Sequence, residues 1–193
     1  MGARERNRLR TRQRIVEAAA ELHTTVGPAR TTVMGIAERA GVQRHTVYAH
    51  FPDESAIFRA CTAHWLDLNP LPDHERWTAI ASFEDRVEAA IRDVHEWWER
   101  TADDLIPVMA DVGRVAAMAE AIDFWRERTG AWVAAVLAGH GLRGRRRART
   151  EAALRHALAL ETWRSLTASD GMTPSEAVRL MSGFVRQAAE PGR

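Results

Sequence analysis

Residues 31–51 read Thr-Thr-Val-Met-Gly-Ile-Ala-Glu-Arg-Ala-Gly-Val-Gln-Arg-His-Thr-Val-Tyr-Ala-His-Phe. In the first half of this stretch, apolar residues recur at helical spacing: Val33, Ile36, Ala37 and Ala40. This spacing predicts a short helix with one buried face. We expect Gly41 to end it, because glycine adopts a positive φ without the steric cost of a side chain. A second short helix follows at once, so the stretch predicts a helix-turn-helix motif, which places side chains in a DNA major groove.

The candidate DNA contacts lie mainly on the second helix of this motif. Its apolar positions can face inward, which leaves its polar and long side chains to a partner. We expect Arg44 and His45 to reach base edges and Tyr48 and His50 to contact phosphates. The complete set adds one upstream arginine and the two threonines at the start of the first helix. Either threonine can also accept a hydrogen bond from a free backbone amide there. The candidates are Arg10, Thr31, Thr32, Gln43, Arg44, His45, Thr46, Tyr48 and His50.

The motif and its flanks resemble the tetracycline-repressor (TetR) family of bacterial transcription regulators. Upstream, residues 14–22, Arg-Ile-Val-Glu-Ala-Ala-Ala-Glu-Leu, resemble the first helix of that family. Downstream, residues 48–54, Tyr-Ala-His-Phe-Pro-Asp-Glu, resemble the end of its recognition helix and the beginning of its fourth helix. Three positions depart from the family pattern: Gln43 replaces a small hydroxyl cap, His45 replaces a frequent glycine, and Ser55 stands near a frequent lysine that contacts phosphate.

Charge is divided unevenly along the chain. Residues 1–50 contain nine arginines and four glutamates, whereas residues 51–193 contain eighteen arginines and twenty-two acidic residues. A basic amino-terminal third suits attraction to a polyanion such as DNA. The densest part has an arginine at every second position from Arg4 to Arg14. Alternate positions of a helix point in different directions, so we expect the first of these arginines to belong to a flexible arm.

Cysteine content and hydropathy favour a cytoplasmic protein. The single Cys61 cannot form an internal disulfide, so nothing indicates an oxidising compartment. The first residues are polar and arginine-rich, without the apolar stretch of a signal peptide. The longest apolar run, residues 131–139, is too short to span a bilayer. We therefore expect no contact with a membrane.

The sequence lacks the common motifs of enzymatic sites. A Gly-rich phosphate loop, a nucleophile elbow and the His-Glu-x-x-His pattern are all absent from it. Cys61 and His64 could supply two metal ligands from one helix face, but no third ligand is nearby in the sequence. We therefore expect neither an enzyme nor a resident metal or cofactor.

Beyond residue 53 the pattern stays helical, without the two-residue alternation of strands. Thr173-Pro-Ser-Glu is the clearest helix start, because it combines an N-cap, a proline at the first helical position and a reciprocal glutamate. We expect helices over about 53–68, 82–100, a short one from Thr101, 115–138, 147–168 and the residues after Thr173. The sequence thus predicts an all-α fold of about nine helices. A three-helix DNA-binding head occupies residues 1–53, and a helical effector-binding and dimerisation domain occupies residues 54–193.

Seven tryptophans all lie after the predicted head. Such rings at helical spacing are often core residues, and this interpretation stays open for each of them. The family resemblance, however, implies an effector pocket among the fifth to eighth helices, so several rings are expected to line an apolar cavity for a flat, hydrophobic molecule. The candidate ligand contacts are Trp97, Trp98, Met109, Trp125, Trp132 and Trp163.

The last two expected helices are apolar on more than one side. Packing against the rest of the domain would explain this breadth, and a four-helix contact between two copies would also explain it. The resemblance implies such a homodimer, in which two recognition helices in successive major grooves read a palindrome. The candidate interface residues are Leu154, Leu158, Met181, Phe184 and Val185.

Together these observations predict a DNA-binding transcription regulator. The leading hypothesis is a repressor that a small hydrophobic or aromatic ligand releases from a palindromic operator in double-stranded DNA. Two alternatives stay open: a regulator with the same head that a protein partner controls, and a helical enzyme with a borrowed helix-turn-helix motif. A domain without a cavity would favour the first alternative, and turnover of a bound compound would favour the second.

Overall fold

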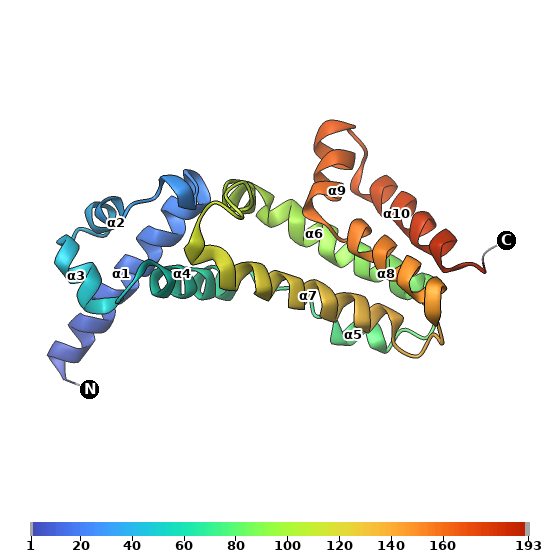
Figure 1. Cartoon of the computed structure of the whole chain (residues 1–193), viewed down its shortest axis with the longest axis horizontal. Coiled ribbons are helices and arrows are strands. Elements are labelled where there is room, and N and C mark those ends of the chain that lie inside the picture. Colours follow the sequence, from blue (N-terminus) through green and yellow to red (C-terminus); the bar gives the residue numbers. More distant parts are fainter. Residues whose placement is uncertain (1, 192–193) are drawn as a thin grey trace. The chain divides into compact units, whose positions relative to one another are not determined.

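The computed structural model describes residues 2–191, which form ten α-helices and contain no strand (Figure 1). The predicted all-α fold is confirmed. The chain divides into two compact units. The first unit runs to Pro70 and also includes Asp103–Phe124. The second unit comprises Leu71–Ala102 and continues from Trp125.

Four helices build the amino-terminal part of the first unit: α1 Ala3–Thr25, α2 Val33–Ala40, α3 Arg44–His50 and α4 Glu54–Leu68. Helix α1 packs along both α2 and α4 (Figure 1). The core that these four helices share contains Ile15, Val16, Ala19, Val33, Ile36, Val47, Phe51, Ile57 and Cys61. Because Ile57 and Cys61 belong to α4, the core that positions the helix-turn-helix motif extends past residue 53. The border of the head at that residue stays a prediction.

Helix α1 begins at Ala3, so the flexible arm expected for the first arginines is wrong. The stretch from Ala3 to Arg14 includes neither glycine nor proline, and arginine is a good helix former. Glu5 lies in the first turn, where a negative charge suits the helix dipole. The arginines between residues 4 and 14 are all exposed on this helix.

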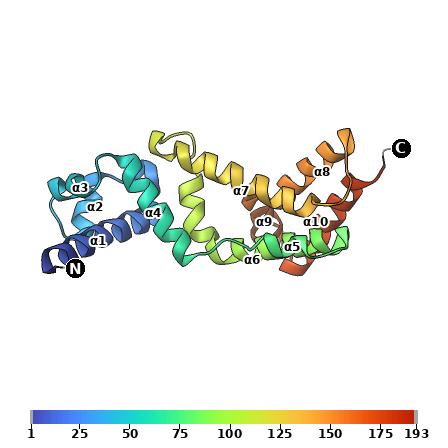
Figure 2. The same ribbon diagram turned by 90° about the horizontal axis from the view of Figure 1, so that it is seen from below.

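The remaining helices are α5 Glu75–Thr78, α6 Phe83–Met109, α7 Ala119–Leu137, α8 Gly144–Ala157, α9 Leu160–Arg164 and α10 Pro174–Ala189 (Figure 2). Helices α6 and α7 contribute residues to both units. In the second unit, α10 packs along α8. The predicted start of α10 is confirmed: Thr173 Oγ1 accepts a hydrogen bond from the Glu176 amide at 3.3 Å, and the Glu176 carboxylate accepts one from the Thr173 amide at 2.9 Å.

Helix α6 is continuous through Thr101, so the helix start predicted there is wrong. The hydroxyl of Thr101 is buried and donates a hydrogen bond to the Trp97 carbonyl at 2.7 Å. It is therefore satisfied inside the helix and caps nothing. Pro107 lies inside the same helix, two residues before its end at Met109, and donates no helical hydrogen bond because it has no backbone N–H.

The helix predicted over 147–168 is interrupted between α8 and α9. Two side chains of α6 donate hydrogen bonds to carbonyls at this break. Nε2 of His95 lies 2.9 Å from the Ala157 oxygen, and Nε1 of Trp98 lies 3.0 Å from the Leu158 oxygen. These tertiary hydrogen bonds replace helical ones, and residue spacing along α8 and α9 carries no sign of them.

Arg86 joins the carboxyl end of α7 to the segment after α5. Its side chain is only 5% exposed. The guanidinium donates to the carbonyls of Thr78 at 3.2 Å and Ile80 at 2.8 Å, and to those of Ala135 at 3.3 Å and Ala138 at 2.6 Å. Carbonyls at the end of a helix lack helical partners, so Arg86 satisfies groups that would otherwise be buried without a donor.

No helix within residues 2–191 is long and apolar enough to cross a bilayer. The same residues contain no group of three or more histidine, cysteine, aspartate or glutamate side chains placed to hold a metal ion. Cys61, which the sequence paired with His64 as a possible ligand, is buried with its Sγ 3.3 Å from Nδ1 of His23.

Candidate nucleic-acid interface

Helices α2 and α3 form the predicted helix-turn-helix motif. Thr32 caps α2, because its Oγ1 accepts a hydrogen bond from the Gly35 amide at 3.0 Å. Gly41 ends α2 with φ of 64°, in the left-handed region. The next amide, of Val42, donates back to the Ala37 carbonyl at 2.9 Å, which closes the turn. The predicted roles of Thr32 and Gly41 in forming the motif are therefore confirmed.

Arg14 of α1 holds this turn from outside the motif. Its Nη2 donates to the carbonyl of Ala40 and, at 3.1 Å, to that of Gly41. A Cβ at Gly41 would lie 2.7 Å from this nitrogen, which is the end of a flexible side chain that can move aside, so it is the positive φ angle that favours glycine here. Residue spacing carries no signal for this role of Arg14, because the contact spans more than twenty residues and depends on how α1 packs.

Helix α3 turns its predicted contact residues outward. Val47 is fully buried and Phe51, which follows the helix, is 2% exposed, so these two residues anchor α3 on the core. Thr46 and His50 are half-buried, whereas the side chains on the outer face are exposed: Gln43, Arg44, His45 and Tyr48. The separation follows from the helical period, since residues three or four positions apart share a face.

Arg44 and Tyr48 form a pair on this outer face. The guanidinium carbon of Arg44 lies 5.5 Å from the centroid of the Tyr48 ring, and its Nη2 lies 3.4 Å from the tyrosine hydroxyl. The stacking is a cation–π contact that limits the motion of a long side chain. The contact therefore restrains the exposed Arg44 guanidinium on the outer face of α3.

The other predicted DNA contacts occupy different surroundings. Thr31 is half-buried, and its hydroxyl donates to the Gly27 carbonyl at 2.9 Å, so it orders the loop before α2 rather than capping that helix. Thr32 uses its hydroxyl oxygen as the cap. Arg10 is exposed on α1. A direct role for each of them on DNA stays a prediction.

A groove of about 540 Å³ runs between the first turns of α1 and the end of α3. It is lined by Gly2, Arg4, Glu5, Asn7, Arg8, Thr11, Thr46 and His50. Partial burial, together with the nearby charges of Arg8 and Arg12, lowers the pKa of His50. The Arg12 guanidinium also lies 4.8 Å from the centroid of the Phe51 ring. The structure thus brings the amino-terminal arginines, which the sequence assigned to a flexible arm, beside the predicted recognition helix.

The loop between α1 and α2 is held by Asp111, which lies beyond the carboxyl end of α6. The buried Asp111 carboxylate accepts a hydrogen bond from the Ala29 amide at 2.9 Å. Gly27 has φ of 89°, and a Cβ there would lie 2.7 Å from a carboxylate oxygen of Asp111. Asp111 was not among the predicted site residues, because its contact depends on chain segments 82 residues apart.

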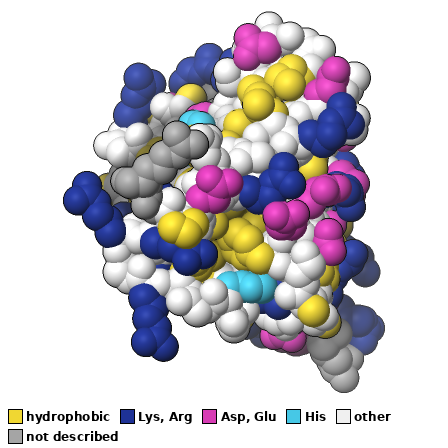
Figure 3. All heavy atoms as spheres, turned by 90° about the vertical axis from the view of Figure 1, so that its right-hand side faces the viewer, with side chains coloured by type: hydrophobic (Ala, Val, Ile, Leu, Met, Phe, Trp, Pro, Cys, Tyr) yellow, Lys and Arg dark blue, Asp and Glu magenta, His cyan; other side chains and the backbone are white. Residues whose placement is uncertain are grey.

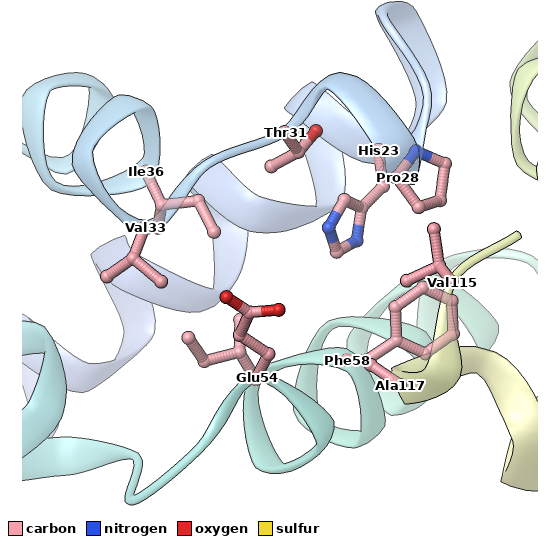
Figure 4. Close-up of a pocket in the computed structure, with 10 residues that line it drawn as sticks. His23, Pro28, Thr31, Val33, Ile36, Glu54, Phe58, Val115 and Ala117 are labelled. Atoms are coloured by element: carbon pink, nitrogen blue, oxygen red, sulfur yellow. The ribbon is translucent and has the colours of Figure 1, made fainter.

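A small pocket lies beside this loop, between α1, α4 and the turn Ala116–Met118 (Figure 4). His23, Pro28, Phe58 and Val115 point into it, and its volume of about 30 Å³ is that of a single water rather than of an organic ligand. Burial lowers the pKa of His23 to about 4 and raises the pKa of Cys61 to about 12. Both groups are therefore neutral at pH 7.

Three of the predicted ligand-binding rings meet in the second unit. The ring centroids of Trp97 and Trp98 lie 4.7 Å apart, and that of Trp125 lies 5.7 Å from the first and 6.2 Å from the second. Trp97, Trp98 and Trp132 are buried, whereas Trp125 and Trp163 are half-buried. Met109 belongs to the first unit instead. Mutual packing also suits core residues, so the ligand role of these side chains stays a prediction.

The predicted dimer residues divide into two groups. Leu154, Leu158, Met181 and Val185 are buried within the single chain, where α8 and α10 pack together. Phe184 is 44% exposed, next to a depression of about 480 Å³ that α8 and α10 line. Leu180, which is not among the predicted interface residues, is 48% exposed. Figure 3 shows apolar side chains between charged ones on the face that it presents.

The geometry of α1–α4 defines a helix-turn-helix DNA-binding domain, with a buried anchor on α3 and a polar outer face. The family described as "Bacterial regulatory proteins, tetR family" matches residues 15–61. The resemblance to the TetR family that the sequence predicted is therefore confirmed over residues 15–61.

Two curated relatives, both from Pseudomonas putida, are each 38% identical to this chain over an alignment of 76 residues, and the alignment covers 36% of this chain. They are the HTH-type transcriptional regulator SrpR and the uncharacterised HTH-type transcriptional regulator TtgW. The match spans 36% of SrpR and 57% of TtgW. A crystal structure of a TetR transcriptional regulator from Rhodococcus sp. RHA1 aligns with 93% of this chain and 96% of its own, at 21% identity and a TM-score of 0.46.

Proposed function

We propose that this protein regulates transcription by binding double-stranded DNA as a homodimer. The observation that carries the proposal is the division of α3 into a buried anchor, Val47 and Phe51, and an exposed face with Arg44, His45 and Tyr48. A short helix that is held in this way can enter a major groove, where side chains reach base edges. The family match of residues 15–61 supports the same function.

Arg44 is the residue that we propose recognises a base. Its guanidinium is exposed, stacks on Tyr48 and makes no ion pair among residues 2–191, so its donors are available to the two acceptors on the major-groove edge of guanine. Tyr48 and His50 are the proposed phosphate contacts. Contacts of this second kind contribute affinity without sequence preference and weaken as salt increases.

A dimer can recognise a longer DNA site than one small domain can. One recognition helix covers a short half-site, whereas two in successive major grooves read a palindrome. The proposed interface lies on the outer faces of α8 and α10, where Phe184 and Leu180 remain exposed in the single chain. A two-fold contact of this kind buries the same apolar patch on both copies.

The finer part of the proposal is a repressor that a small apolar effector releases. Support comes from Trp97, Trp98 and Trp125, whose rings gather in the second unit. Two of these rings lie on α6, and Asp111, which holds the loop before α2, follows the end of the same helix. A ligand with different affinities for two positions of α6 would shift the equilibrium of the DNA-binding heads.

Selection from a pool of random duplexes tests the DNA-binding function. We expect the protein to enrich a palindromic site, and Arg44→Ala to lose about 1–3 kcal/mol of binding free energy on that site while relaxing the preference at one base pair of each half-site. Arg145→Ala is the matched control, since Arg145 is an exposed arginine on α8. Failure to enrich any site, or equal losses from the two variants, would contradict the proposal.

Binding of planar aromatic compounds tests the effector. A true effector should quench tryptophan fluorescence and raise the unfolding temperature of the protein. It should also weaken the affinity of the protein for the operator, and the operator should weaken the affinity for the effector by the same factor. Trp125→Ala should reduce these effects and leave operator affinity unchanged. If no compound produces the reciprocal effect, while a cellular protein does, the protein-controlled alternative replaces this part of the proposal.

A further inference from the structure

Helix α1 extends beyond the family match, which begins at residue 15. The helical period divides the arginines of this extension into two rows. Arg4, Arg8 and Arg12 follow each other at intervals of four residues, and the same face continues into the core residues Ile15 and Ala19. The other row lies on the opposite side of the helix: Arg6, Arg10 and Arg14.

The first row is directed toward the end of α3. Arg12 stacks on Phe51, and the charges of Arg8 and Arg12 act on the His50 ring. Arg4 and Arg8 then line the groove of about 540 Å³ together with Thr46 and His50. In Figure 1 the first turns of α1 run past the end of α3. The face of α1 that packs on the core thus becomes, further toward its amino terminus, one wall of an open basic groove.

The charges in this groove are not neutralised within the described part of the chain. Arg4 and Arg8 are exposed and form no ion pair among residues 2–191, and Glu5 is the only acidic residue that lines the groove. The opposite wall supplies the Thr46 hydroxyl and the N–H of the His50 imidazole, which a neutral ring keeps. Two guanidinium groups facing two neutral donors form a set that suits an anionic oxygen cluster.

We infer that this groove binds the sugar–phosphate backbone of DNA beside the major groove that α3 enters, with Arg4 and Arg8 on one side of a phosphodiester and Thr46 and His50 on the other. The inference rests on the proposed DNA binding, and it assigns the helical extension a function that residues 15–61 alone do not perform. Phosphate contacts fix the orientation of a recognition helix without reading bases. The extension would therefore raise affinity for every sequence and set the angle of α3.

The test compares charge-matched double variants of the full-length protein. Arg4→Gln with Arg8→Gln removes the proposed contact, and Arg143→Gln with Arg145→Gln removes the same charge from the loop and start of α8. The probes are a random-sequence duplex of about 30 base pairs and a site selected from a random pool, each titrated over a range of salt concentrations. Glutamine is a good helix former, so α1 should persist in all variants, which circular dichroism checks.

We expect the Arg4 and Arg8 pair to lower affinity roughly tenfold to a hundredfold on both probes and to reduce the salt slope by about one for each phosphate that the variant no longer neutralises. The preferred base at each position should not change. The Arg143 and Arg145 pair should leave affinity unchanged. Equal losses from the Arg4 with Arg8 and the Arg143 with Arg145 variants would overturn the inference, because net charge alone would then explain the effect.

Different results would reject DNA binding by the protein and the contact of the groove with phosphate. If Arg44→Ala relaxes specificity but the Arg4 and Arg8 pair leaves both affinity and salt slope unchanged, the protein reads DNA through α3 and the groove is not part of the interface. If the wild-type protein binds neither probe, the proposed function itself fails. A loss on the selected site alone would also contradict a backbone contact, since phosphates are present in every duplex.

Discussion

The two units both use an arginine at the carboxyl end of a helix, but in opposite environments. Arg14 is exposed and donates to the last carbonyls of α2 and to the Gly41 turn. Arg86 is buried and donates to the last turn of α7 and to the segment after α5. Water can replace the first guanidinium but not the second. The comparison shows that the same hydrogen bonds carry different energetic consequences, because burial decides whether the acceptors have an alternative partner.

The exposed side chains of α3 and α10 differ in polarity. Helix α3 leaves arginine, histidine and tyrosine outside, whereas α10 leaves Leu180 and Phe184 outside, beside polar residues such as Arg179 and Gln187. A polar face loses little by remaining in water until it meets a polyanion. An apolar face gains free energy as soon as a matching surface covers it. In the proposed dimer, α3 would make a regulated contact with DNA and α10 a permanent one with the second copy.

The largest effect is expected at Arg86. Arg86→Met should lower the free energy of unfolding by about 3–5 kcal/mol, because several buried carbonyls lose their donor together. Arg14→Met should cost only about 1 kcal/mol, since water reaches the exposed turn. Chemical denaturation followed by circular dichroism measures both. Similar losses from the two variants would show that burial does not separate the two arginines.

Phe184→Glu tests the apolar face of α10. The residue is exposed in the single chain, so the variant should fold, whereas a dimer would bury an unpaired carboxylate twice. We expect association to weaken at least about a hundredfold, by roughly 3 kcal/mol. Sedimentation of the folded fraction measures this, with Ser175→Glu at the start of the same helix as the charge-matched control. A Phe184→Glu protein that remains dimeric would exclude this face from the interface.

Acid should destabilise the first unit through His23. Its pKa is lowered to about 4 by burial, against 6.5 for an exposed histidine, so the folded state binds the proton less readily than the unfolded state. The resulting stability is complete above pH 6.5 and is lost as pH falls toward 4, by about 3 kcal/mol. His95 in the second unit is buried too, but its hydrogen bond to the Ala157 carbonyl opposes the lowering of its pKa.

Unfolding free energies measured between pH 7.5 and 4.5 test the predicted acid sensitivity. Titration by NMR gives the pKa of His23 and of His95 separately. The variant His23→Gln should remove most of the acid sensitivity of the first unit. If the wild-type and the variant lose stability in parallel, another group causes the acid sensitivity.

The smallest effect is expected from a comparison of two glycines. Gly41→Ala should lower the free energy of unfolding by about 1–2 kcal/mol, because a residue with a Cβ is strained in the left-handed conformation. The added Cβ would also lie 2.7 Å from the Arg14 guanidinium nitrogen, which would have to move. Gly130→Ala in α7 meets nothing within 4 Å and should instead stabilise the protein by about 0.5–1 kcal/mol. Thermal unfolding distinguishes the two signs, and a stabilising Gly41→Ala would contradict the proposed role of the turn.

Local features of the sequence were sufficient for the elements that depend on neighbouring residues. The Thr32 cap, the Gly41 turn, the outward face of α3 and the Thr173 capping box were all predicted correctly. Each depends on residues within a few positions of one another, where backbone geometry and hydrogen-bonding capacity leave few solutions. The family resemblance depended on the same stretch and was confirmed over residues 15–61.

Elements that depend on distant residues were not predictable in this way. Thr101 carries the signal of a helix start, yet its hydroxyl is satisfied inside α6. The break after α8 is stabilised by His95 and Trp98, which approach from α6. Alternating arginines suggested an arm, whereas α1 is helical from Ala3 and divides them into two rows. In each case a partner far away in the chain, or the cooperativity of a long helix, outweighs the local preference.

The sequence by itself determined the helical class, the helix-turn-helix motif and the side chains that α3 turns outward, because a period of 3.6 residues and one glycine turn define them locally. Only the tertiary structure decided which arginines flank α3, that Asp111 holds the loop before α2, and that Phe184 remains exposed while Leu154 and Val185 are buried. Those outcomes depend on the direction in which one helix packs on another. That direction is set by the fit of whole surfaces and not by the spacing of residues along either helix.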